Sequence, residues 1–488
     1  MLRLCYLSIL LLAACSATLP SLRAPVVPSL ERGMADKPLA PAAALPAAAA
    51  EPLAAYVVLT AEGHAQARVI LAAGACPPLQ VDGASVPSLA RVEPATPAQR
   101  PGQALASVFP ERICALDLPA SAREVRLGER TLPLPAPQIR RVVVVGDTGC
   151  RIKQSEAAYQ DCSSAQAWPF ASVARAAAGE RPDLVVHVGD YHYRETPCPA
   201  QLGCASSPYG YGWDAWNADF FSPAASLLAV APWVFARGNH EECARAGQEW
   251  FRALDPGAYS PVRSCNDPAL DNEANVSPPY AVPLGDGWQL VVFDSARASR
   301  PLDPARPADA RILQAYGEQM RQASALAARP GVQTLFVNHH PILGFALEHD
   351  EAVHFGNAGL LNALHAVNGD ALFPAGVAAT LHGHVHAFEA VHFASDHPVA
   401  LVSGHGGDKL DPELPDTLPA RYDQAPGVVL DFAAHGRGFG YLVMDRSDAG
   451  WTLRAQALDG SVIARCTLLG RDLQCAQGAI SHPAPMAP

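Results

Sequence analysis

Five short polar segments of the 488-residue chain contain residue types that bind metal ions. In chain order they are Gly146-Asp147-Thr148-Gly149, Gly189-Asp190-Tyr191-His192-Tyr193, Gly238-Asn239-His240-Glu241, Asn338-His339-His340-Pro341 and Gly383-His384-Val385-His386. Carboxylate, amide, phenol and imidazole groups are oxygen and nitrogen donors, which suit zinc, manganese or iron. Side chains at alternate positions of an extended segment point apart, so His384 and His386 fit two metals bound at a bent turn better than one metal.

Each of these segments follows a short apolar run that is typical of a buried strand. We expect strands over 141–145, 184–188, 233–236, 289–293, 334–337, 378–381 and 399–402, with helices over 170–178 and 308–328 between some of them. Alternating strands and helices predict a layered α/β domain, and such folds bind ligands at the carboxyl ends of their strands. The polar segments lie at those ends.

The N-terminal residues of the chain predict that the protein is exported. Arg3 precedes an apolar run over 4–12 that is too short to span a membrane. The run ends in Leu12-Ala13-Ala14-Cys15-Ser16, which resembles a lipobox, so residues 1–15 are predicted to be a lipoprotein signal peptide with Cys15 lipidated. An ordinary export signal with an incidental cysteine is the alternative. We expect a disordered tether over 16–52, a small all-β domain over 53–137, the catalytic domain over 138–475 and a disordered tail over 476–488.

Ten further cysteines form an even set, which in an exported chain indicates disulfides. Pairing of neighbours is the simplest scheme: Cys76–Cys114, Cys150–Cys162, Cys198–Cys204, Cys243–Cys265 and Cys466–Cys475. The net charge is −12 and no basic cluster is present, so nucleic acid is not expected as a dedicated partner.

The five segments, in this order, resemble the motifs of the calcineurin-like metallophosphoesterases over about residues 140–407. Within that superfamily the chain is similar to purple acid phosphatases. Most members have Asp-x-His in the first motif, whereas this chain has Asp147-Thr148-Gly149. The purple branch instead has a tyrosine three residues after the second aspartate, and Tyr193 stands there. The resemblance implies an α/β/β/α sandwich, which the small β domain would precede.

The resemblance also implies a site with two metal ions. Metal one would be bound by Asp147, Asp190, Tyr193 and His386, and metal two by Asp190, Asn239, His339 and His384. Alignment on His-x-Pro selects His339 in the fourth motif, and alignment on Val-x-x-His selects His340. We prefer His339 because the proline turn is the more constrained feature. His240 would protonate the leaving group, and His340 and His349 would face the substrate.

Three anionic ligands opposite a trivalent and a divalent ion would leave a positive site that attracts phosphate and acidifies a bound water. The resemblance thus implies Fe(III) with zinc, manganese or iron, and a phosphomonoesterase that uses a metal-bound hydroxide. A phosphodiesterase acting on nucleotides or phospholipid head groups is the alternative. A lipoprotein that only binds metal or phosphate would not need His240 beside Asn239. We expect the protein to be anchored by lipid at the outer membrane or the periplasmic face.

Overall fold

The computed structural model describes residues 51–300, 302–347 and 352–485. The predicted signal peptide with Cys15, nearly all of the predicted tether, and His349 lie outside the described residues. Predictions that depend on them are not addressed by the fold.

The first of two large sheets has eleven strands among the described residues. In order across the sheet they are β28 (Asp472–Gln477), β27 (Val462–Leu469), β26 (Trp451–Ala457), β25 (Gly440–Arg446), β9 (Arg141–Val145), β12 (Leu184–His187), β13 (Trp233–Phe235), β1 (Ala54–Leu59), β2 (Ala65–Leu71), β6 (Arg112–Asp117) and β5 (Leu89–Val92). The central strands β9, β12 and β13 run parallel to one another. Their carboxyl ends therefore lie at one edge of the sheet.

In the described part of the chain the second large sheet has ten strands. Its order is β14 (Tyr280–Gly285), β15 (Trp288–Val292), β16 (Gln333–Val337), β19 (Val377–His382), β21 (Val399–Ser403), β20 (Phe388–Phe393), β24 (Ala425–Gly436), β29 (Ala479–Pro483) and β22 (Thr417–Leu418), with β23 (Arg421–Tyr422) beside β24. Strands β15, β16, β19 and β21 are parallel. The strands predicted from the sequence are confirmed to within one residue at each end.

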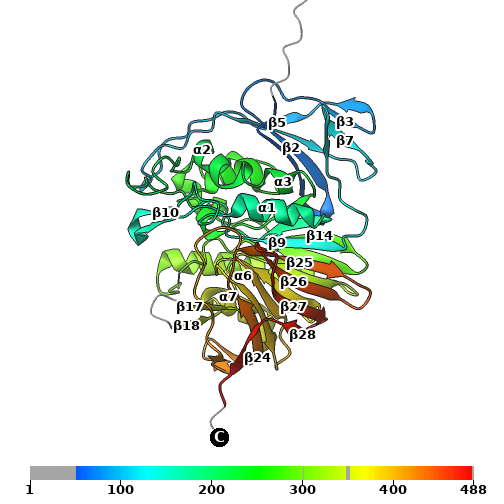
Figure 1. Ribbon diagram of the computed structural model, residues 1–488, viewed down its shortest axis with the longest axis vertical. Coiled ribbons are helices and arrows are strands. Elements are labelled where there is room, and N and C mark those ends of the chain that lie inside the picture. The colour runs from blue at the N-terminus through cyan, green and yellow to red at the C-terminus, as the bar shows by residue number, and fades with distance from the viewer. Residues whose placement is uncertain (1–50, 301, 348–351, 486–488) are drawn as a thin grey trace, which may run out of the picture. The chain divides into compact units, whose positions relative to one another are not determined.

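The two sheets pack face to face, and helices cover their outer faces. In β9 the successive side chains alternate: Val142 and Val144 join the core between the sheets, while Val143 and Val145 pack on the helix side. Helices α1 (Phe170–Gly179) and α3 (Ala225–Leu228) cover the first sheet, and α6 (Pro307–Ala327) and α7 (Ala358–Asn368) cover the second. Figure 1 shows these helix pairs in two separate groups. The predicted α/β/β/α architecture is confirmed.

The segment 53–137 differs from the expected separate β domain. Strand β1 pairs in parallel with β13, and β2, β6 and β5 continue from it, so four strands of this segment extend the first sheet. A smaller sheet contains β3 (Leu79–Val81), β4 (Ala84–Val86), β7 (Val125–Leu127) and β8 (Arg130–Leu132). The fully buried Arg68 of β2 donates from Nη2 to the Asp255 carbonyl at 2.7 Å. The proline-rich stretch 133–137 is thus a connection within one unit, Ala49–Pro488.

The C-terminal segment also differs from the expected disordered tail. Strand β29 pairs with β24 through Ala479, Ile480 and Ser481, and with β22 through His482 and Pro483. Ser481 is fully buried and donates its hydroxyl to the Pro415 carbonyl at 2.6 Å. Backbone pairing with the sheet edge therefore orders a sequence that has no clear strand pattern of its own.

All five predicted disulfides are present: Cys76–Cys114, Cys150–Cys162, Cys198–Cys204, Cys243–Cys265 and Cys466–Cys475. Disulfides persist in oxidising environments, so they indicate an extracellular or otherwise oxidising location. Within the described ranges no helix is long and apolar enough to cross a membrane.

Candidate metal centre

The five polar segments meet at the carboxyl ends of strands from both sheets. Asp147 follows β9, Asp190 follows β12, Asn239 follows β13, His339 follows β16 and His384 follows β19. Backbone hydrogen bonds join neighbouring segments: Asp147 N–H donates to the Gly189 carbonyl and Gly383 N–H to the His339 carbonyl, both at 3.0 Å. Parallel pairing of the strands thus gathers side chains that lie far apart in the sequence.

Three of these residues have a left-handed backbone, with φ of 56° at Asp147, 58° at Asp190 and 70° at His384. Such conformations cost free energy in non-glycine residues and occur where surrounding structure enforces them. The adjacent glycines are part of that structure. A Cβ at Gly238 would lie 2.1 Å from Asp190 Oδ1, and one at Gly383 would lie 2.4 Å from Asp147 Oδ2. Gly238 and Gly383 therefore make room for the carboxylates of Asp190 and Asp147.

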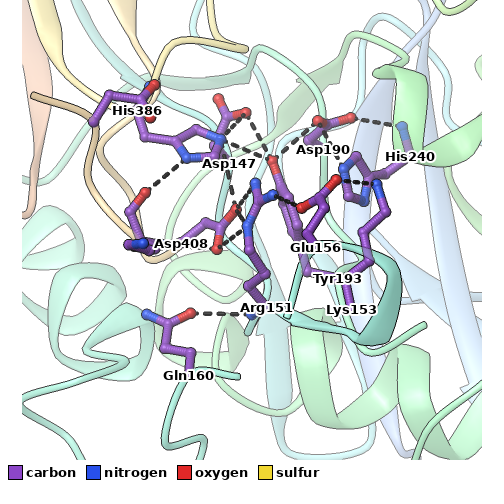
Figure 2. A network of polar contacts seen from close by, with 12 residues as sticks. Asp147, Arg151, Lys153, Glu156, Gln160, Asp190, Tyr193, His240, His386 and Asp408 are labelled. Atoms are coloured by element: carbon purple, nitrogen blue, oxygen red, sulfur yellow. Dashed lines mark hydrogen bonds and ion pairs between the residues drawn. The ribbon is translucent and has the colours of Figure 1, made fainter. Parts of the chain in front are cut away.

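One cluster of side chains surrounds the hydroxyl of Tyr193. The hydroxyl oxygen lies 3.0 Å from Asp147 Oδ1, 3.0 Å from Asp190 Oδ2 and 3.2 Å from His386 Nε2. The carboxylates and the phenol are buried, and His386 is 6% exposed. Figure 2 shows the four side chains pointing toward one another. These are the four residues that the sequence resemblance assigns to metal one.

A second cluster adjoins the first through Asp190. His339 Nε2 lies 3.1 Å from Asp190 Oδ2 and 3.0 Å from Asn239 Oδ1. His384 Nδ1 lies 3.1 Å from the same Asn239 oxygen. Asp190 thus has its carboxylate between the two clusters, as a shared ligand would.

Backbone carbonyls fix the orientation of two of the imidazoles. His339 Nδ1 lies 2.9 Å from the Val188 carbonyl oxygen, and His386 Nδ1 lies 2.8 Å from that of Lys409. A carbonyl oxygen only accepts hydrogen bonds, so each Nδ1 carries the hydrogen. The lone pair of a neutral ring is then on Nε2, which in both residues faces a cluster.

His340 lies beside the second cluster. Its Nδ1 is 3.1 Å from the Ser295 hydroxyl, and its ring centroid is 4.3 Å from that of His384. Its Nε2 is buried and has no hydrogen-bond partner in the described structure. His339 contacts Asp190 and Asn239, and ligand atoms of His339, His340 and His384 also lie within 4.8 Å of one another, so both histidines of the fourth motif remain candidate ligands.

His240 lies at the side of the clusters with its Nε2 3.8 Å from Asp190 Oδ2. Its Nδ1 lies 2.9 Å from the His192 carbonyl oxygen and 2.9 Å from Glu195 Oε1. Arg245 pairs with Glu195 and lies 2.7 Å from the same Nδ1. Burial, together with Arg245, lowers the pKa of His240 to about 4. Sequence reasoning missed Glu195 and Arg245, although Glu195 follows Tyr193 by only two residues.

Arg151 and Asp408 form a second pair that sequence reasoning missed. Arg151 Nε and Nη2 donate to Asp408 Oδ2 at 3.0 Å and 2.6 Å, and its guanidinium carbon lies 5.0 Å from the centre of the Tyr193 ring. Asp408 is fully buried, and its Oδ2 is 3.5 Å from His386 Nε2. Figure 2 shows the pair beneath the first cluster. Asp408 lies outside the five motifs, so their spacing carried no signal for it.

The electrostatics of the clusters favour bound cations. Burial, and then the charges of Asp147 and Asp190, raise the pKa of the Tyr193 hydroxyl well above its usual value. Burial lowers the pKa of His339, but the charge and hydrogen bond of Asp190, together with the charge of Asp147 and the Val188 carbonyl, outweigh burial and raise the pKa to about 9. Ligand atoms of Asp147, Asp190 and His339 lie within 4.8 Å of one another. Buried oxygen and nitrogen donors that attract protons in this way fit metal ions.

Comparisons with known proteins identify the family of the chain. The family model for calcineurin-like phosphoesterase matches residues 140–388. A search of curated proteins found no match. A purple acid phosphatase from yellow lupin (Lupinus luteus) seeds is 15% identical, with 88% of this chain and 74% of that chain covered and a TM-score of 0.46.

Two further solved structures are similar over much of their length. PhoD is 12% identical, with coverage of 89% of this chain and 94% of that chain and a TM-score of 0.48. GAP50, the anchor in the inner membrane complex of Plasmodium, is 13% identical, with coverage of 68% and 89% and a TM-score of 0.37. The family match covers just over half of the chain and includes all five polar segments, so the chain belongs to the calcineurin-like phosphoesterase family.

Proposed function

We propose that the protein is a metal-dependent phosphoric ester hydrolase of the purple acid phosphatase type, acting on phosphomonoesters. The single observation that carries this proposal is the position of Tyr193. Its hydroxyl lies within 3.2 Å of Asp147, Asp190 and His386, at the centre of an anionic cluster. A packing residue would not need its polar atom there.

In this proposal Asp147, Asp190, Tyr193 and His386 hold one ion, and Asp190, Asn239, His339 and His384 hold the other. When bound, two such ions would neutralise phosphate oxygens and acidify a water molecule. His240, in its protonated form, would donate from Nε2 to the leaving group, and Glu195 orients the ring from the Nδ1 side. His340 and His349 remain proposed substrate-facing residues.

The two adjacent histidines of the fourth motif give a matched test of the ligand set. His339→Ala should remove one ion per chain, because His339 is the imidazole that contacts Asp190 and Asn239. His340→Ala should retain both ions. Metal analysis after equilibrium dialysis measures the difference, with thermal unfolding as the control for folding. Loss of an ion from the His340 variant alone would reverse the assignment.

The function is tested by turnover of phenyl phosphate and of a phenyl diester on metal-loaded protein. We expect the monoester to react faster and a chelator to abolish both activities. His240→Ala should keep both ions but lower turnover, since a positioned general acid contributes typically about 10²–10⁴-fold. The loss should be larger for an alkyl phosphate than for nitrophenyl phosphate, whose leaving group hardly needs a proton.

Each outcome separates the alternatives. Faster turnover of the diester would favour a phosphodiesterase acting on nucleotides or phospholipid head groups. Absence of metal-dependent turnover on every ester would favour a lipoprotein that only binds metal or phosphate. Equal losses on alkyl and nitrophenyl esters would remove His240 from the role of leaving-group acid.

The position of Tyr193 also leads us to expect that the iron-loaded protein is coloured. A phenol whose pKa is raised by burial and two carboxylates ionises there only opposite a highly charged ion, which favours Fe(III), with zinc, manganese or iron as the second ion. The iron-loaded, oxidised protein should then absorb visible light by charge transfer from the Tyr193 ring. Tyr193→Phe should abolish the band and reduce activity without removing the three other ligands.

Tyr191→Phe is the matched control for that spectrum. Tyr191 is also fully buried next to Asp190, but its hydroxyl donates to the Ala236 carbonyl at 2.8 Å. Its variant should retain the band. An oxidised iron-loaded protein without a visible band, or a band that survives in the Tyr193 variant, contradicts the tyrosinate assignment.

We further propose that the protein is a lipoprotein anchored through Cys15, which lies outside the described residues. The disulfides support export, and the lipobox-like sequence Leu12-Ala13-Ala14-Cys15 supports the anchor. Several acyl chains on one residue give stable anchoring, at about 0.8 kcal/mol per buried CH₂ group. Mass spectrometry of the mature N-terminus should find an acylated Cys15. A mature chain that begins elsewhere contradicts the anchor and leaves the enzymatic proposal intact.

A further inference from the structure

A large cavity adjoins the first cluster of the candidate metal centre. It has a volume of about 1030 Å³, and His386, Arg151, Lys409 and Arg437 are among its lining residues. A second cavity of about 420 Å³ shares Arg151, Lys409 and Arg437 with it. The shared residues make the two cavities parts of one groove that begins at His386.

Lys409 both lines the groove and contacts the candidate metal centre through its backbone. Its carbonyl oxygen accepts the Nδ1 hydrogen of His386 at 2.8 Å, and its side chain lines both cavities. The preceding residue, Asp408, holds Arg151 against the Tyr193 ring. The wall of the groove therefore includes the segment that orients His386.

The groove contains two cations that have no partner. Arg151 is neutralised, because it donates to Asp408 and, at 2.7 Å, to Glu156. Lys409 and Arg437 are exposed, and across the described residues their side chains form no hydrogen bond or ion pair. Lys409 is one of three lysines in the chain, at positions 37, 153 and 409.

Acidic residues line the larger cavity but not the smaller one. Glu156, Asp411 and Glu413 line the larger cavity. Glu156 is paired with Arg151 and Lys153, and Asp411 accepts the backbone N–H of His386 at 2.8 Å. The smaller cavity has no acidic lining residue. At that end Lys409 and Arg437 have no acidic residue beside them in the lining, whereas Asp411 and Glu413 share the lining of the larger cavity with the same two cations.

The same end has aromatic walls. Tyr159 and Phe439 line the smaller cavity and are half-buried. Aromatic faces bind flat rings by stacking. Stacking does not use the hydrogen bonds that a neighbouring cation forms with an anion, so both contacts can be made at once. A ligand of this cavity would combine an anionic group with a ring.

We infer that the groove is a specificity subsite for phosphate monoesters whose leaving group carries a second anionic group beside an aromatic ring. This inference rests on the proposed function. In the reaction, the water oxygen bonds to phosphorus, the phosphorus–oxygen bond to the leaving group breaks, and the leaving oxygen takes up a proton. Lys409 and Arg437 bind the second anion and take no part in these bond changes.

The test compares 4-(phosphonomethyl)phenyl phosphate with 4-methylphenyl phosphate. Both release a phenol, and the phosphonate is not hydrolysed, so they differ chiefly in the second anion. For the unaltered protein we expect kcat/KM to be about tenfold higher for the phosphonate ester, mostly through KM, which corresponds to about 1.4 kcal/mol. The preference should decrease with rising salt, because the cations are exposed.

Lys409→Ala and Arg437→Ala should each lower that preference, and the double variant should abolish it. Turnover of 4-methylphenyl phosphate should remain within about twofold in the Arg437 variant, because Arg437 is neither a proposed ligand nor a residue that orients one. Arg130→Ala, which removes an exposed arginine of β8, is the control and should keep the full preference.

Two results would overturn the inference while leaving the proposed function standing. One is an unaltered protein that hydrolyses both esters equally well, and the other is a double variant that retains the preference. Failure of metal-loaded protein to hydrolyse either ester would instead refute the proposed function, and the inference with it.

Discussion

The side chains of Asp147 and Asp190 are buried and both contact the hydroxyl of Tyr193. One carboxylate oxygen of each lies 3.0 Å from the hydroxyl oxygen. Two carboxylates in one dry site repel each other, and each loses its hydration, so the arrangement requires positive charge close by. The surrounding imidazoles, and the ions that these donors fit, supply that charge. Much of the local backbone serves to hold the two carboxylates in this position.

A buried carboxylate behind the site holds the two central loops together. Glu241 accepts hydrogen bonds from the backbone N–H groups of Tyr191, Asp190 and Gly238 at 2.9, 3.1 and 3.1 Å. It thereby joins the loop that carries Asp190 and Tyr193 to the loop that carries Asn239 and His240. The disulfide Cys243–Cys265 closes the second loop just beyond this point. The geometry of each cluster thus depends on contacts that point away from it.

Much of the fold and of the candidate site could be predicted because both leave local patterns. Apolar runs identified β9 and β12, and the glycine-flanked polar residues after them identified Asp147 and Asp190. The parallel pairing of β1 with β13 could not be predicted, since it joins residues about 175 positions apart through backbone atoms alone. The partnership of Arg151 with Asp408 spans 257 residues and has no local signal either. The orientation of His339 depends on the carbonyl of Val188, which lies about 150 positions earlier in the chain and leaves no local signal at the fourth motif.

The unusual first motif has a steric explanation in the fold. Most of the superfamily is expected to have a histidine where this chain has Gly149. A Cβ at Gly149 would lie 2.8 Å from Tyr193 Cδ2 and 2.8 Å from the Tyr191 carbonyl oxygen, closer than real Cβ atoms approach. Any side chain at position 149 would therefore displace the Tyr193 ring from the first cluster. Glycine at position 149 therefore fits the placement of the Tyr193 ring and of the backbone that carries it.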